Sequence, residues 1–189
     1  IAAASTISLS SGASTTATAA QANALVTLAD SDLNTVIRSL DISDTAANIQ
    51  QTAAATLAAV DSVTVSDEGA LTIDVAQANA IFDSANDGVH TQNSAANSEG
   101  SLRANYTISD TAANISTQIG SDADVIENAS AVTVTDAATE AQAANLISII
   151  SHAGAIAFNI EDSVSNIFSG DALDTAANIN GATNVTVSD

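Results

Sequence analysis

Short runs in which apolar and polar residues alternate recur along the chain, and an alanine-rich stretch follows each of them. In "AVTVTD" (131–136) valines alternate with threonines, which is the period-two pattern of a half-buried strand. Similar runs are "LDIS" (40–43), "LTID" (71–74), "YTIS" (106–109) and "FNIE" (158–161). The Asp or Ser that closes such a run is a good helix N-cap, because its side chain can accept hydrogen bonds from the first free backbone amides. The pattern therefore predicts a strand followed at once by a short helix.

Three phrases recur in a fixed order, which indicates an internal repeat. "DTAANI" starts at Asp44, Asp110 and Asp174, so that its copies lie 66 and 64 residues apart. The strand phrase "VTVSD" or "VTVTD" occurs at 63–67, 132–136 and 185–189, and the helix phrase "AQANAL", "AQANAI" or "AQAANLI" at 20–25, 76–81 and 141–147. The chain therefore reads as about three copies of a unit of 63–66 residues.

A strand, a cap and a short helix that recur in this way predict an α/β chain folded as a right-handed β/α solenoid. Strands that are joined through helices lie parallel, and such crossovers are right-handed. We expect one parallel sheet on one wall and short Ala-rich helices on the other, with each repeat buried against its neighbours. We also expect Ile49, Ile115 and Ile179 to turn back from the helices toward the strands.

The whole chain, 1–189, is predicted to be a single solenoid. Its units are approximately 1–40, 41–106 and 107–171, and 172–189 starts the next one. Residues 83–105 are polar and poor in β-branched residues. They are interpreted as an irregular loop or a degenerate repeat, and such a loop is also a place where binding can reside.

The composition is unusual in its small side chains and in its one-sided charge. The chain has 42 alanines among 189 residues, with three Phe, one Tyr and no Trp, so its core must consist of thin, closely packed layers. The chain has 22 acidic residues and only two basic residues, Arg38 and Arg103, so its net charge is −20. This charge excludes a binder of nucleic-acid phosphates. The sequence contains no apolar run long enough to span a membrane, and no cysteine for a disulfide or a thiolate metal site.

The recurring acidic and amide residues are the candidate functional and structural groups. Aspartates at the strand-to-helix bends are candidate calcium ligands as well as caps, and they are Asp44, Asp67, Asp110, Asp136, Asp174 and Asp189. The calcium nonapeptide GGxGxD and an EF-hand loop are both absent, so the charge excess is the main reason for this prediction. A structural ladder of asparagines is predicted to bridge adjacent repeats, at Asn48, Asn79, Asn114, Asn145 and Asn178.

No motif predicts a catalytic site. His90 and His152 are the only histidines, and no nucleophile-elbow glycine pattern accompanies the many Ser and Asp residues. We therefore predict that the chain is not an enzyme. A polysaccharide-active enzyme on a solenoid scaffold is the weaker alternative. Threonines that alternate with valines on flat strands, as in "VTVT" (132–135), could also form a hydroxyl lattice of the kind that ice-binding solenoids use.

The phrases "SDTAANI", "VTVTD" and "AQAANLI" resemble the repeats of very large secreted bacterial surface proteins. These include repetitive adhesin-like and haemolysin-type calcium-associated proteins of marine bacteria, cyanobacteria and other Gram-negative bacteria. The resemblance covers most of the chain through its three units. It implies an extracellular or cell-surface location, a structural or adhesive role, and secretion in an unfolded state.

The two ends of the sequence carry strand-like residues in place of a polar capping repeat. Ile7 and Leu9 near the start, and Val185 and Val187 near the end, are the predicted assembly interface. Exposed strand edges invite another copy to dock, and contacts that do not close give fibres. We expect a structural extracellular protein that stacks head to tail with itself into a filament, sheath or surface layer. The alternative is an adhesin or phage-fibre segment that binds a cell-surface receptor or a glycan.

Overall fold

The computed structural model describes seven segments of the chain, and the fold is given for these segments alone. They are 14–28, 39–67, 69–82, 106–121, 123–149, 156–168 and 176–188. The predicted irregular segment 83–105 and the predicted interface residues Ile7 and Leu9 lie outside them. The chain forms two compact units, of which the first comprises 1–71 and 76–102 and the second 72–75 and 103–189. Each unit is described by itself.

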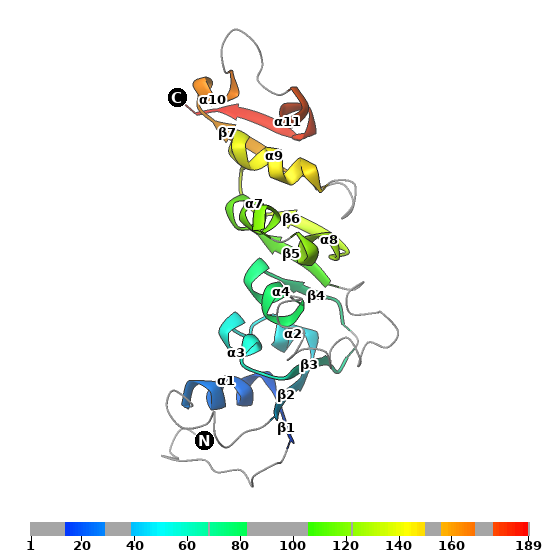
Figure 1. Cartoon of the computed structure of the whole chain (residues 1–189). Coiled ribbons are helices and arrows are strands. Elements are labelled where there is room, and N and C mark those ends of the chain that lie inside the picture. Colours follow the sequence, from blue (N-terminus) through cyan, green and yellow to red (C-terminus); the bar gives the residue numbers. More distant parts are fainter. Residues whose placement is uncertain are drawn as a thin grey trace. The chain divides into compact units, whose positions relative to one another are not determined.

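The first unit contains one parallel sheet and the helices that connect its strands (Figure 1). Its elements are β1 (Ser14–Ala17), α1 (Ala19–Leu28), β2 (Ser39–Asp44), α2 (Ala46–Ile49), α3 (Ala54–Ala58) and β3 (Ser62–Val65). The strands lie in the order β1-β2-β3. Ala17, Ile42 and Val63 are register partners across the sheet, and all three are buried. They form the apolar layer against which the helices pack.

The strand β4 (Leu71–Ile73) belongs mainly to the second unit, whereas α4 (Val75–Phe82), apart from Val75, belongs to the first. The second unit holds a sheet in the order β4-β5-β6 and a sheet of β7 and β8. Its further elements are β5 (Tyr106–Asp110), α7 (Ala112–Ser121), α8 (Asp124–Glu127), β6 (Ala131–Val134), α9 (Glu140–Ser148), β7 (Asn159–Asp162), α10 (Val164–Ile167), α11 (Ala176–Gly181) and β8 (Asn184–Val187).

The prediction of an α/β chain with parallel strands joined through short helices is confirmed by these elements. A single continuous sheet was expected, but the described strands form three small, separate sheets. In the second unit the reason lies at Ala138, which forms only an isolated parallel bridge to Ile160. The stretch around it, "TDAAT" (135–139), lacks the β-branched run that a full strand needs.

Small residues allow the helices to approach the sheets closely. Ile49 and Ile115 are fully buried at the end or middle of their helices, as predicted, whereas Ile179 in α11 is half-buried. Ala78 and Ala143, both on the helices with the "AQA" phrase, are also completely buried. An alanine at such a position leaves the backbones of neighbouring helices close together, so the thin core expected from the composition is present.

Candidate functional site

Asp44 lies at the end of β2, and its carboxylate connects two successive strand–helix segments. Its Oδ2 atom accepts a hydrogen bond from the backbone amide of Ala19, 3.0 Å away, at the first residue of α1. Its Oδ1 atom accepts from the amide of Thr45 and from Nδ2 of Asn48, both at 2.8 Å. The first amides of a helix have no partner within that helix and carry partial positive charge, so a carboxylate stabilises them well. The side chain of Asp44 therefore links the start of α1 to the end of β2.

This arrangement corrects the expectation that the aspartates cap the helices that follow them. Thr45 is the N-cap of α2, and its side chain accepts from the amide of Asn48. Asp44 stands one residue earlier and turns to the helix of the preceding segment. One motif, "DTAAN", thus supplies a cap for its own helix and a contact to its neighbour.

The same junction is formed twice in the second unit, by Asp110 and Asp162. In each case one carboxylate oxygen accepts from the first amide of an earlier helix, and the other accepts from the next residue's amide and from the Asn four residues on. The donors are Val75, Thr111 and Asn114 for Asp110, and Glu140, Ser163 and Asn166 for Asp162, at 2.7–3.0 Å. We call Asp44, Asp110 and Asp162 the junction aspartates.

Asp162 is not among the aspartates predicted from the sequence. The third copy of the repeated phrase predicted a candidate at Asp174, which lies outside the described residues. The "AANI" after Asp174 opens α11, which leads into β8. The signal that could have identified Asp162 is the spacing D-x-x-x-N after an alternating run, which "FNIEDSVSN" (158–166) shares with "YTISDTAAN" (106–114).

Asp67 and Asp136 follow the "VTV" strands and form a simpler contact. Oδ1 of Asp67 accepts from the amide of Ala46 at 3.0 Å and from that of Gly69 at 3.2 Å. Oδ1 of Asp136 accepts from the amide of Ala112 at 2.7 Å. The hydrogen bond from Ala46, followed by that from Gly69, lowers the pKa of Asp67. Both carboxylates are exposed, so they complete helix starts without being buried.

Hydrogen bonding also shifts the titration of two junction aspartates. The side-chain amide of Asn48 is the largest cause that lowers the pKa of Asp44, ahead of the two backbone amides that it accepts from. The hydrogen bond from the side chain of Asn166 is likewise the largest cause of the lowered pKa of Asp162. Donors that favour the charged form of a carboxylate outweigh partial burial here, so both groups remain ionised at acidities that protonate an ordinary Asp.

The asparagines divide into two groups with different partners. Asn48 and Asn114 are exposed and donate to the Asp four residues before them, so they brace a bend within one segment. Asn145 bridges segments, because its Nδ2 donates to the carbonyl oxygen and to Oγ of Ser116, 29 residues away. Asn79 is half-buried, and the side chain of Asn178 lies outside the described residues. Asn145 therefore joins two segments, whereas Asn48 and Asn114 make their hydrogen bonds to Asp within one segment. A ladder that includes Asn79 and Asn178 stays a prediction.

The candidate calcium ligands do not converge within the part of the chain that the structure describes. No group of three or more His, Asp or Glu side chains there is arranged to hold a metal ion. Asp174 and Asp189 lie outside that part, as do His90 and His152. Calcium binding stays a prediction.

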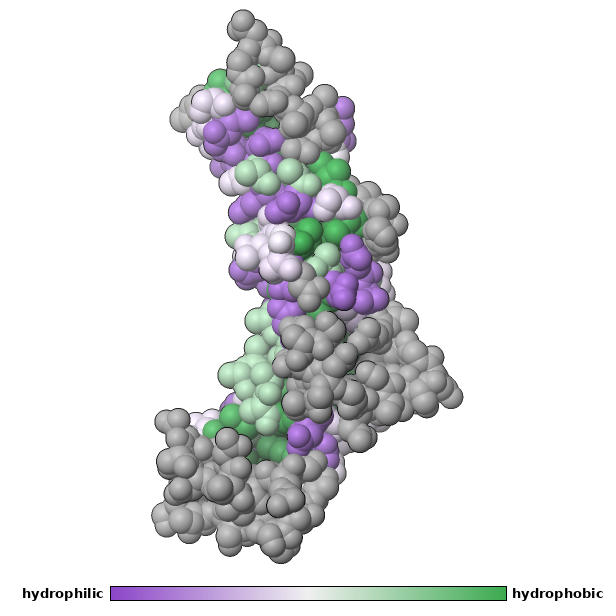
Figure 2. All heavy atoms as spheres, in the orientation of Figure 1, coloured by the Kyte–Doolittle hydropathy of each residue, from purple (hydrophilic) through white to green (hydrophobic). Residues whose placement is uncertain are grey.

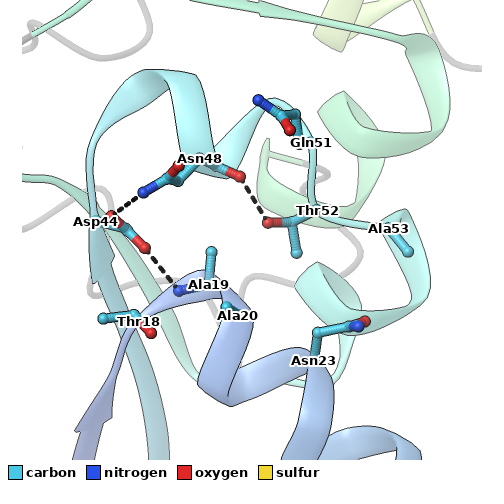
Figure 3. Close-up of a pocket in the computed structure, with 9 residues that line it drawn as sticks. All are labelled: Thr18, Ala19, Ala20, Asn23, Asp44, Asn48, Gln51, Thr52 and Ala53. Carbon is cyan, nitrogen blue, oxygen red and sulfur yellow. Dashed lines mark hydrogen bonds between the residues drawn. The ribbon is translucent and has the colours of Figure 1, made fainter.

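A hollow of about 440 Å³ opens beside Asp44 in the first unit. Figure 3 shows Asp44 and Asn48 on one side of it, and Asn23 and Gln51 on others. Asn23 comes from α1 and accepts a hydrogen bond from the hydroxyl of Thr56. The lining of the hollow combines amides, hydroxyls and small apolar groups with the Asp44 carboxylate, which suits a polar molecule that carries hydrogen-bond donors. The volume of the hollow lies in the range of small-ligand sites.

The predicted interface residues on β8 are exposed, although the equivalents of Val185 in the other two "VTV" strands are buried. Val185 is the register partner of the fully buried Ile160, yet Val185 is 37% exposed and Val187 is 44% exposed. In the other two "VTV" strands, Val63 and Val132 are exposed by 1% and 7%. Because the alternation of the strand is the same in all three, the difference reflects what lies against β8 and not the strand itself.

Two further exposed apolar residues lie near this strand and were not predicted. Val164 and Phe168, at the two ends of α10, are each 44% exposed. Asp162 of β7 is the register partner of Val187, and its carbonyl oxygen accepts from the amide of Ser188 at 3.0 Å. Val164 is therefore close to the carboxyl end of β8. Sequence periodicity could not identify these two residues, because in a four-residue helix it does not separate covered from open faces.

Comparison with known proteins returned no matching family model, no similar curated protein and no similar solved structure. Among the described residues, none of the helices has the length and apolar character needed to cross a membrane.

Proposed function

We propose that this chain is a structural extracellular protein in which the strand–helix segments form a right-handed β/α solenoid that stacks end to end. The observation that carries the proposal is the recurrence of one junction at Asp44, Asp110 and Asp162. A contact that is repeated between successive segments, with the same atoms in the same roles, is what a stacked repeat requires. The resulting assembly is a filament, a sheath or a surface layer.

The side-chain chemistry supports a scaffold more than a catalyst. The junction carboxylates are occupied by backbone amides and asparagine amides, so their hydrogen-bonding capacity serves the fold. The core consists of Ala, Ile, Leu and Val with one buried Tyr and one buried Phe. Such thin layers fit many copies of one unit and leave little room for a deep reaction cleft. We therefore propose a non-enzymatic role at the cell surface or outside the cell.

A second candidate function is adhesion, and the hollow beside Asp44 favours it. Amide and hydroxyl groups of Thr18, Asn23, Asn48 and Gln51 could hydrogen-bond the hydroxyls of a glycan. The lining contains no aromatic ring on which a sugar could stack. For this reason the adhesin or phage-fibre role comes second, with a glycan or cell-surface receptor as its partner.

Electron microscopy of the negatively stained protein, with calcium and after chelation, tests the proposal. Long filaments or sheets are expected, and their loss on chelation would assign a bridging role to calcium. Short isolated particles at every calcium and salt concentration would contradict the structural role. In that case binding to a glycan array, compared between the wild type and an Asn23→Ala variant, would test the adhesive role.

A further inference from the structure

Four exposed apolar residues of the second unit define one surface, which we call the exposed apolar face. They are Val164, Phe168, Val185 and Val187, and the described residues contain no other exposed large apolar side chains. Figure 1 shows α10 beside the carboxyl end of β8, in agreement with the hydrogen bond from the amide of Ser188 to the carbonyl of Asp162. A strand and a helix therefore contribute to the same face.

Like the contacts between successive strand–helix segments inside the unit, this face combines apolar residues from a strand and from a helix. In those internal contacts, Val132 of β6 and Ile160 of β7 are buried in the strand layer, and Leu146 of α9 and Ile167 of α10 are buried in the helix layer. Each internal contact thus covers apolar side chains in both layers at once. A single extended peptide could pair with the edge of β8, but it would leave Val164 and Phe168 uncovered. The occupant must bring a strand and a helix together.

We infer that a second copy of this chain docks on the exposed apolar face, with one of its own strand–helix segments. The inference rests on the proposed function and names the surface that would join the subunits. A second copy supplies a segment with the same strand spacing and the same small helix residues as the internal contacts. The interface therefore continues the stacking already present within the unit, and the contact is of the open, head-to-tail kind.

The net charge of the chain predicts how docking on the exposed apolar face depends on salt. Figure 2 shows hydrophilic residues spread over the visible face of the second unit, with smaller hydrophobic areas between them. The net charge of −20 makes two copies repel each other at low salt. The four residues of the exposed apolar face are uncharged, so contact through these side chains does not itself bring carboxylates together. Screening by salt, which shortens the reach of charge to about 3 Å at 1 M, should promote docking.

The test compares charge-introducing variants on and off the face. Sedimentation velocity and negative-stain microscopy are carried out on the full chain at low salt and at about 1 M NaCl, where the Debye length is shortest. Val185→Glu should raise the concentration needed for assembly at least about tenfold, because a carboxylate would be buried in the contact. Val164→Glu should do the same, and it should not harm folding, since an acidic residue in the first turn of α10 favours the helix.

Two matched controls carry the same charge at neighbouring positions. Thr186→Glu lies on β8 with its side chain on the opposite side of the sheet, and Ser165→Glu lies beside Val164 on α10. Both should assemble like the wild type. If the wild type forms polymers and Val185→Glu and Val164→Glu form them equally well, the exposed apolar face is not the contact, although the proposed function stands. If Thr186→Glu alone prevents assembly, the copies associate through the sheet surface and the inference is wrong. If the wild type forms no polymers at any salt concentration, both the inference and the proposed function fail.

Discussion

The junction formed by Asp162 can be tested by a single-atom change with a matched neighbour. In Asp162→Asn one carboxylate oxygen becomes an amide NH₂ group, which cannot accept a hydrogen bond. The wild-type side chain accepts from Glu140 on one oxygen, and from Ser163 and Asn166 on the other. The variant can keep the hydrogen bonds from Ser163 and Asn166 on its remaining oxygen. Its NH₂ group, which is a donor, then faces the amide of Glu140, which is also a donor. The adjacent change Glu161→Gln removes the same charge from an exposed side chain.

The expected cost of Asp162→Asn is about 1–2 kcal/mol. A buried hydrogen bond to a charged group contributes about 1.5–3 kcal/mol. Asp162 is only half-buried, so water replaces part of that contribution and the lower end applies. Since α9 begins at Glu140, the loss should appear first as fraying at the start of that helix.

Hydrogen exchange of the Glu140 amide is the assay, because Asp162 is its hydrogen-bond acceptor. A cost of one or two kcal/mol corresponds to exchange that is about 5–30-fold faster. The amide of Ala112, held by Asp136 in the same unit, should exchange at the wild-type rate. Equal protection of the Glu140 amide in Asp162→Asn and Glu161→Gln would refute the reasoning, because the effect would then belong to net charge alone.

The pH dependence of the same comparison follows from the lowered pKa of Asp162. The native state holds this carboxylate ionised below the usual value of 3.8, so the unfolded chain binds the proton first as the pH falls. The stability from Asp162 is therefore fully present above that value and is lost as the pH falls through the lower native pKa. The difference between the wild type and Asp162→Asn should be constant near neutral pH and should shrink below about pH 4. A difference that grows on acidification would contradict the assignment.

Three further substitutions test packing, each by urea unfolding. Tyr106→Phe should lower the free energy of unfolding by about 1–2 kcal/mol, because the buried carbonyl of Val125 loses the hydroxyl that donates to it at 2.6 Å; an unchanged midpoint would show that this bond contributes nothing. Gly69→Ala should destabilise the first unit, since the added Cβ would lie 2.9 Å from Cβ of Ala46. Gly120→Ala should stabilise by about 0.5–1 kcal/mol, because its Cβ would find no atom nearer than 3.9 Å and alanine favours the helix. If Gly69→Ala raised the free energy of unfolding and Gly120→Ala lowered it, backbone freedom and not the contact of the added Cβ would decide the effect.

The strand–helix rhythm could be predicted from sequence because it depends on local chemistry. The alternation in "YTIS" (106–109) and the small residues after it specify a strand and a helix without reference to distant parts of the chain. The partners of Asp44 could not be found in this way. Its second oxygen meets Ala19, 25 residues earlier, and only the packing of two segments decides that contact. The cap position was misjudged by one residue for the same reason, since Asp44 and Thr45 are both good caps and the neighbouring helix competes for one of them.

The prediction of a single continuous sheet was wrong, because the described strands form separate sheets. The predicted strand at 131–136 is followed by residues with little β propensity, and Ala138 among them forms only a single bridge to Ile160. The repeated phrase suggests equal units, whereas the variable stretches between phrases decide how much of each strand forms. Exposure at Val185 and Val164 also depends on neighbours and not on composition.

The positions of the carboxylates predict that salt affects the folding of one molecule and the assembly of several molecules differently. Among the described residues, six carboxylates accept hydrogen bonds from backbone amides at close range, and salt screens such contacts little; they are Asp44, Asp61, Asp67, Asp110, Asp136 and Asp162. Others, such as Glu161, are exposed and add to a net charge of −20 that opposes the approach of a second copy. Unfolding should therefore depend weakly on salt, while assembly should depend on it strongly. If both responded to salt in parallel, the aspartates would act through the general field of the molecule, and the junction would not explain their recurrence.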